Sequence, residues 1–118
     1  MTLDTSAIVA VVRDEVDAVR LAATMEYAPL LEVGTPTLVE SGMVLIGRLG
    51  PTGQELLQRF MQERQVRILP FGPDHWQVAV EAFIRFGKGR HPAALNLGDC
   101  FTYASAKLAG EPLLCLGN

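Results

Sequence analysis

The chain has 118 residues, 49% of them apolar and 19% charged, with a formal net charge of −3. This length is enough for one domain with one hydrophobic core, and the acidic balance gives no general attraction to nucleic acid. No run of eighteen apolar residues is present, so we expect no membrane-spanning segment.

Two features predict a cytoplasmic protein. The apolar stretch 7–12 has no basic leader and is followed by charged residues at 13–15, which argues against a secretory signal peptide. Cys100 and Cys115 lack the spacing of a metal site or a disulfide framework, and both lie among apolar residues. We therefore expect two reduced, buried thiols in the cytoplasm.

The first half of the chain alternates short apolar runs with longer amphipathic ones. This pattern predicts strands at 1–4 and 30–34, and helices at 7–12, 15–27 and 35–49. Thr5 or Ser6 is a candidate N-cap of the first helix, and Thr35-Pro36 begins the third. Because the helix 35–49 is apolar on most sides, we expect it to be buried.

The second half repeats this alternation after Gly50-Pro51 interrupts the chain. The pattern predicts helices at 53–63, 73–86 and 99–109, and strands at 66–70 and 113–116. A basic loop at 87–92 precedes the last helix, for which Asp99 is a candidate N-cap. Strands that alternate with pairs of helices indicate an α/β fold with a mainly parallel sheet.

Three acids from distant parts of the chain are placed at one edge of this sheet. Asp4 ends the first strand, Glu40 lies early in the helix after the second, and Asp99 begins the helix before the fourth. Taken singly, Asp4 fits a turn residue and Asp99 a helix cap, whereas a buried Glu40 needs a partner or a metal. Taken together, they favour a hard cation, Mg²⁺ or Mn²⁺, at the carboxyl edge where open α/β folds bind ligands.

Three segments carry a resemblance to a known family: LDTSA at 3–7, TLVE at 37–40, and FGKGRHPAALNLGDCFTYASAKLAGEPLL at 86–114. With this spacing, the chain resembles PIN-domain endoribonucleases, and more closely the VapC toxins of VapBC toxin–antitoxin pairs. The resemblance implies one PIN-like domain over 1–118, a three-layer α/β/α sandwich with a short, mainly parallel sheet. It also implies a Mg²⁺-dependent endoribonuclease toxin in which Asp4, Glu40 and Asp99 are the catalytic, metal-binding acids.

The family's fourth acid commonly follows the fourth strand, where this chain has Leu116-Gly117-Asn118. We expect the natural protein to continue beyond Asn118, with the fourth acid either there or replaced by Asn118. The hydroxyls of Thr5 and Ser6 are candidates to support the site, although either fits a helix cap equally well. Asn96 is a candidate for ordering the loop beside the site.

The densest basic segment comprises Arg85, Lys88, Arg90 and His91. We expect these residues to contact RNA phosphates, and the alternative is an ordinary solvated loop. The resemblance further implies a VapB-like antitoxin as protein partner and a homodimer, with the apolar helix 38–49 as part of either the interface or the core.

Two other functions stay open from the sequence. One is a catalytically silent PIN-like adaptor that binds RNA or protein, and the other is a different Mg²⁺-dependent phosphoryl-transfer domain. Asp4-Thr5-Ser6 lacks the second Asp of a DxDxT phosphatase motif, and the chain contains no P-loop, which counts against the second.

Overall fold

The computed structural model describes residues 1–116. Within them, six helices and four short strands follow one another: β1 (Thr2–Leu3), α1 (Thr5–Val12), α2 (Ala18–Tyr27), β2 (Glu32–Gly34), α3 (Thr35–Leu49), α4 (Thr52–Glu63), β3 (Arg67–Leu69), α5 (Pro73–Phe86), α6 (Leu97–Ala109) and β4 (Leu113–Leu114). None of these helices combines the length and the apolar character needed to cross a membrane.

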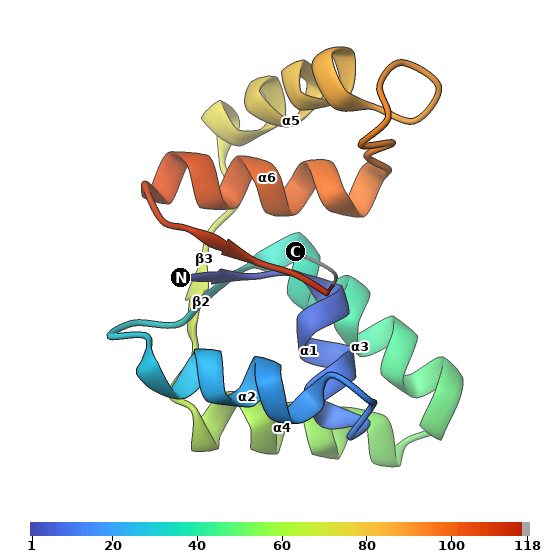
Figure 1. Cartoon of the computed structure of the whole chain (residues 1–118), viewed down its shortest axis with the longest axis vertical. Helices are drawn as coiled ribbons and strands as arrows, with labels where there is room; N and C mark the ends of the chain where they lie inside the picture. Colours follow the sequence, from blue (N-terminus) through green and yellow to red (C-terminus); the bar gives the residue numbers. More distant parts are fainter. Residues whose placement is uncertain (117–118) are drawn as a thin grey trace.

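The sheet has the strand order β3-β2-β1-β4, and every pairing is parallel. Crossovers between parallel strands are right-handed, so two successive crossovers in one direction place their helices on the same face. The crossover from β3 to β4 runs in the opposite direction, and α5 and α6 therefore cover the other face. Figure 1 shows this arrangement, with α5–α6 on one side of the strands and α1 to α4 on the other. The predicted three-layer α/β/α sandwich is confirmed.

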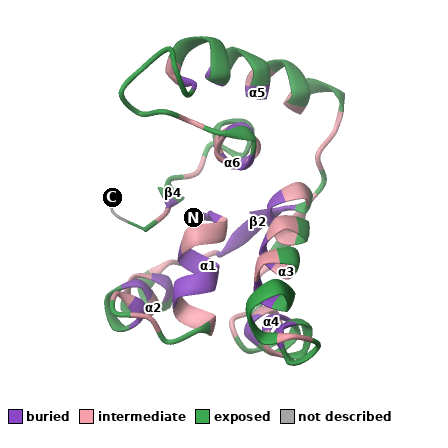
Figure 2. Ribbon diagram, turned by 90° about the vertical axis from the view of Figure 1, so that its right-hand side faces the viewer, coloured by how far each residue is buried: buried purple, intermediate pink, exposed green. Residues whose placement is uncertain are grey.

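The main core lies between the sheet and α1 to α4. Leu3, Ile8, Leu21, Val33 and Leu45 are completely buried there. A smaller cluster joins α5 to α6 through small side chains: Ala79, Ala82, Cys100 and Ala104. In Figure 2 the buried residues accordingly lie on the inner surfaces of the layers, and the outer face of α5 is exposed.

Helix α3 spans the predicted residues, but the expectation that it is buried is wrong. Val39, Met43 and Ile46 have exposed fractions of 57%, 69% and 44%. Only Thr37, Ser41 and Leu45 of this helix are buried, because nothing in the described part of the chain covers its outer face. A helix that is apolar on most sides has the same sequence pattern whether or not another layer covers its outer face.

The other differences concern where elements begin and end. Helix α1 begins at Thr5, with Asp4 rather than Thr5 or Ser6 as its N-cap, because the Asp4 carboxylate accepts the Ser6 amide at 3.4 Å. Helix α2 begins at Ala18 rather than at residue 15, and β4 ends at Leu114 rather than at residue 116.

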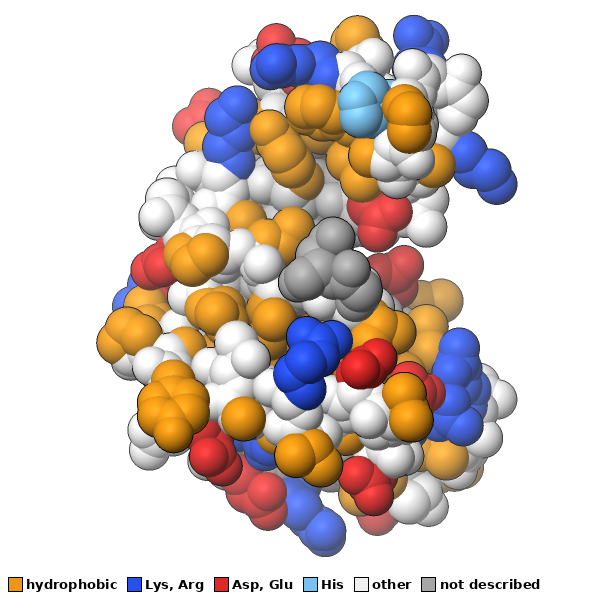
Figure 3. All heavy atoms as spheres, viewed as in Figure 1, with side chains coloured by type: hydrophobic (Ala, Val, Ile, Leu, Met, Phe, Trp, Pro, Cys, Tyr) orange, Lys and Arg blue, Asp and Glu red, His pale blue; other side chains and the backbone are white. Residues whose placement is uncertain are grey.

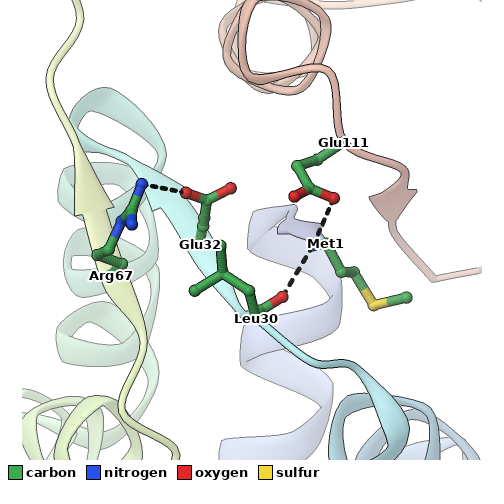
Figure 4. Close-up of polar contacts among 5 residues, drawn as sticks. All are labelled: Met1, Leu30, Glu32, Arg67 and Glu111. Carbon is green, nitrogen blue, oxygen red and sulfur yellow. Dashed lines mark hydrogen bonds and ion pairs between the residues drawn. The ribbon is translucent and has the colours of Figure 1, made fainter.

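Polar contacts join residues that lie in or next to neighbouring strands of the sheet (Figure 4). Glu32 is only 2% exposed within β2, and its carboxylate pairs with Arg67 of β3 at 3.0 Å. The amino group of Met1 donates to the Leu30 carbonyl at 2.8 Å and pairs with Glu111 at 3.2 Å. The two Met1 contacts hold the start of β1 between the segments that lead into its neighbours β2 and β4, and β1 carries Asp4 at its end.

Candidate active site

The three predicted acids lie together at the carboxyl edge of the sheet. Asp4 follows β1, Glu40 is in the second turn of α3, and Asp99 is in the first turn of α6. They line one cavity of about 290 Å³, which Thr5, Ser6 and Asn96 also line. Strand β2 lies on one side of β1, and β4 lies on the other side. The direction of the crossovers therefore reverses next to β1, and open α/β sheets bind ligands at such a switch point.

Asp4 is held on both of its carboxylate oxygens. Its Oδ2 accepts the Ser6 hydroxyl at 2.8 Å, and its Oδ1 accepts the Thr102 hydroxyl at 2.9 Å. The Ser6 hydroxyl also accepts the Leu116 amide at 2.9 Å. The side chain of Asp4 is thereby connected to α6 and to the segment that follows β4.

Glu40 is held by a hydroxyl of α1 and by the close approach of α6. Its Oε1 accepts the Thr5 hydroxyl at 2.6 Å. A Cβ atom added to Gly98 would lie 2.6 Å from the same oxygen and closer still to Oε2. Glycine at position 98 therefore leaves the space that the Glu40 carboxylate occupies.

Asp99 is not the N-cap of α6, contrary to the prediction. The cap is Asn96, whose side chain accepts the Asp99 amide at 3.0 Å, while the Asp99 carboxylate accepts the Asn96 amide at 3.0 Å. Such a reciprocal capping box satisfies two amides that a helix start otherwise leaves unpaired. The N-x-x-D spacing was visible in the sequence, and it makes Asn96 the N-cap of α6; that Asn96 orders the loop beside the site stays a prediction.

Two buried threonines complete the site and were not predicted. Thr102 is 1% exposed and donates to Asp4, and its hydroxyl lies 2.9 Å from that of Thr37, also 1% exposed. Thr37 is three residues before Glu40, and Thr102 is three residues after Asp99. Residues three apart share one face of a helix. This spacing was the available signal that both hydroxyls face the same site as the acids.

The donor set fits a hard divalent cation, although the acids do not converge on one point. Carboxylates are the ligands that Mg²⁺ and Mn²⁺ prefer, and within residues 1–116 no Lys or Arg forms an ion pair with Asp4, Glu40 or Asp99. No group of three His, Cys, Asp or Glu side chains in this range has the geometry of a metal site. The arrangement is thus a set of unneutralised carboxylates, each oriented by a hydrogen bond to the protein.

The predicted basic residues do not line this cavity. The Arg85 guanidinium lies over the Phe86 ring at 5.3 Å, that of Arg90 lies over the Phe83 ring at 5.7 Å, and His91 contacts Phe86 edge-on. The segment between α5 and α6 contributes Ala93 and Leu95, but neither Lys88 nor the other cations, to an adjoining cavity shared with Asp4 and Asp99. Figure 3 likewise shows Lys and Arg side chains dispersed over the visible face. Asn118 lies outside the described residues.

Cys100, next to Asp99, is buried as predicted, whereas the prediction that Cys115 is buried is wrong, because Cys115 follows the short edge strand β4 and is half-buried. Burial, and to a smaller extent the charge of Asp99, raises the pKa of the Cys100 thiol above the ordinary value. A buried, protonated thiol is a poor nucleophile. We therefore assign Cys100 to the packing between α5 and α6, and not to the chemistry of the site.

A parallel three-layer sandwich with carboxylates at its switch point defines the class of protein, and the chain belongs to the PIN-domain family. A family model with the description PIN domain matches residues 1–118. The crystal structure of VapC20 from Mycobacterium tuberculosis, titled a Sarcin-Ricin loop cleaving toxin, has a TM-score of 0.79. The match covers 99% of this chain and 89% of that one at 17% sequence identity, and it supports the fold alone.

Relatives of higher identity place the chain within that family. Ribonuclease VapC36 of Mycobacterium tuberculosis is 42% identical, over 100% of this chain and 86% of the relative. Ribonuclease VapC of Mycolicibacterium smegmatis is 39% identical, over 100% of this chain and 92% of the relative. Within the PIN-domain family, the chain is thus of the VapC type.

Proposed function

We propose that this chain is a metal-dependent endoribonuclease toxin that hydrolyses RNA phosphodiester bonds. The observation that carries the proposal is one cavity lined by three carboxylates, none of which forms an ion pair with a described cation. Similarity over the whole chain to proteins named ribonucleases supports it. The alternative of a silent adaptor is not favoured, because it gives no reason to keep three acids beside one another.

Asp4, Glu40 and Asp99 would hold Mg²⁺, with Mn²⁺ as the alternative cation. When bound, such an ion makes a water more acidic and neutralises charge on the phosphoryl oxygens. The remaining roles belong to the neighbouring side chains. Thr102 and Ser6 orient the two oxygens of Asp4, Thr5 orients Glu40, and the capping box with Asn96 orients Asp99.

The partners follow from the same assignment. We propose an RNA substrate, a VapB-like antitoxin that blocks the cavity, and a homodimer in the cytoplasm. The uncovered face of α3, formed by Val39, Met43 and Ile46, supports an interface on this helix. Apolar groups that are contiguous and exposed are typical of surfaces covered by another protein.

The decisive experiment compares Asp99→Asn with Asp74→Asn. Asp74 also lies in the first turn of a helix, but it is in α5 and does not line the cavity. We expect cleavage of RNA by the wild-type protein in MgCl₂, abolition by EDTA, and restoration by excess Mg²⁺. Asp99→Asn should reduce the rate roughly 100-fold or more, the order of magnitude for losing one group that stabilises transition-state charge, while Asp74→Asn keeps it.

Circular dichroism and thermal unfolding of both variants are the control for folding. Loss of the Asp99 carboxylate keeps a side chain of similar shape, so the fold should persist. A folded Asp99→Asn protein that still cleaves RNA at the wild-type rate in Mg²⁺ would show that this acid is not part of the active site.

A further inference from the structure

A single cationic side chain of the described residues lines the cavity of the three acids, and it is Arg48. It lies in the last turn of α3, eight residues after Glu40. Eight residues of α-helix separate the two Cα atoms by about 12 Å along the axis. Arg48 therefore enters this cavity from a turn of α3 well separated from the turn that carries Glu40.

Arg48 is not neutralised by those acids but shares the carboxylate of Glu15 with a second arginine. Glu15 Oε2 accepts a hydrogen bond from Arg13 Nη1 at 2.7 Å, and Arg48 Nη1 lies 3.6 Å from the same oxygen. The Arg13–Glu15–Arg48 cluster thus contains two positive charges and one negative charge. The Arg48 side chain is 52% exposed, and the longer distance leaves its guanidinium donors available for another ligand.

We propose that the Arg13–Glu15–Arg48 cluster is a phosphate-binding subsite, in which Arg48 binds a backbone phosphate of the RNA next to the one being cleaved. The inference rests on the proposed function and adds to it the residue that positions the substrate. A cation held by the three acids would meet the phosphate being cleaved, and Arg48 is the other positive charge that lines the cavity and can hold the next phosphate of the strand. A guanidinium suits this role, because its fork of donors matches two phosphate oxygens.

Glu15 has a positioning role within the subsite. Its tight pair with Arg13 fixes the carboxylate, and the fixed carboxylate holds Arg48 away from the metal-binding acids. The cluster also joins the end of α1 to the end of α3.

The test is a kinetic comparison of Arg48→Ala, Arg48→Lys and Arg59→Ala in MgCl₂. Arg59 is exposed on α4 and does not line the two cavities that contain Asp4 and Asp99. Its removal changes the net charge by the same amount as the removal of Arg48. We expect Arg48→Ala to raise KM about 3- to 10-fold with little change in kcat. Arg48→Lys should recover part of this loss, because the charge is kept without the fork, and Arg59→Ala should match the wild-type protein.

A second readout measures binding of a fluorescein-labelled, single-stranded RNA by fluorescence anisotropy at several NaCl concentrations. It uses the Asp99→Asn background, in which the RNA stays intact. Losing one phosphate contact should reduce the slope of log K against log salt by about 0.7 for a single strand. Arg48→Ala should show this reduction and Arg59→Ala should not.

The outcomes separate this inference from the proposed function. If the wild-type protein cleaves RNA but Arg48→Ala has the KM and salt slope of Arg59→Ala, the subsite is wrong and the nuclease assignment stands. If the wild-type protein neither binds nor cleaves RNA, both are wrong. Slopes reduced by Arg85, Lys88 or Arg90 changes, and not by Arg48→Ala, would move the phosphate contact to the basic loop and overturn the proposal.

Discussion

Individual side chains at the site are oriented by neutral hydroxyl and amide groups instead of by cations. Asp4 accepts hydrogen bonds from Ser6 and Thr102, and Glu40 accepts one from Thr5. A hydrogen bond from a neutral donor orients a carboxylate without cancelling its charge. The acids therefore keep their negative charge, which suits the cation that we propose here, whereas a lysine or arginine in the same place would compete with such an ion.

Gly98→Ala tests how closely the Glu40 carboxylate must be placed. The added methyl group would lie 2.6 Å from Glu40 Oε1, so the carboxylate must move. Displacement by about an ångström can reduce a rate 100-fold, and we expect at least a tenfold loss of Mg²⁺-dependent cleavage. The free energy of unfolding should not decrease, because a flexible side chain gives way.

The matched control is Gly47→Ala in α3, where an added Cβ meets no atom within 4 Å. Both changes place alanine in a helix, and alanine there favours folding by up to about 1 kcal/mol. Gly47→Ala should keep full cleavage activity. Equal activities of the two variants would show that the position of Glu40 is not critical.

At the scale of elements, the α3–α4 hairpin depends on a close backbone approach at Gly53. An added Cβ at this position would lie 2.5 Å from the Leu45 carbonyl oxygen and 2.9 Å from the Ile46 amide nitrogen. These are backbone atoms of α3, which cannot turn aside as a side chain does. The packing of α4 therefore constrains the helix that carries Glu40.

We expect Gly53→Ala to lower the free energy of unfolding by about 1–3 kcal/mol, the usual cost of overpacking. Denaturant unfolding is the measurement, and Gly42→Ala is the control at the same helix pair. The Cβ of Gly42→Ala would be 3.6 Å from Leu57 Cδ2, an ordinary contact. Equal loss of stability in both variants would contradict the close approach at Gly53.

Sequence patterns predicted which helices and strands form better than they predicted what packs against each of them. The parallel α/β order and the meeting of Asp4, Glu40 and Asp99 follow from strand–helix alternation, which is local. The exposure of Met43 is not determined by the local sequence, since it depends on whether another layer covers α3. The buried hydroxyls of Thr37 and Thr102 depend on how α3 packs on α6, so only their spacing from the acids was visible.

Over the molecule as a whole, residues next to or within α1, α3 and α6 together bring three carboxylates to one cavity, which a cation would fill. Binding of a cation to the folded state alone should therefore stabilise the protein. Ligand at 100 times its Kd adds about 2.7 kcal/mol to the free energy of unfolding. We expect MgCl₂ to raise the Tm by several degrees.

Differential scanning calorimetry with MgCl₂ or EDTA measures this effect. Glu40→Gln should reduce the shift, whereas Glu55→Gln, in the exposed first turn of α4, should not. A wild-type Tm that is the same in Mg²⁺ and EDTA would argue against a metal at these acids.

The pairing of β1 with β4 has a consequence for synthesis of the protein. Thr2 pairs with Leu113, and the Thr102 hydroxyl reaches Asp4 across 98 positions of the chain. Contacts between such distant positions form late in folding. When a ribosome begins to produce α6, the nascent chain already has Asp4 and Glu40 but neither β4 nor a completed cavity. The cavity of the three acids is therefore complete only when almost all of the described chain has been made.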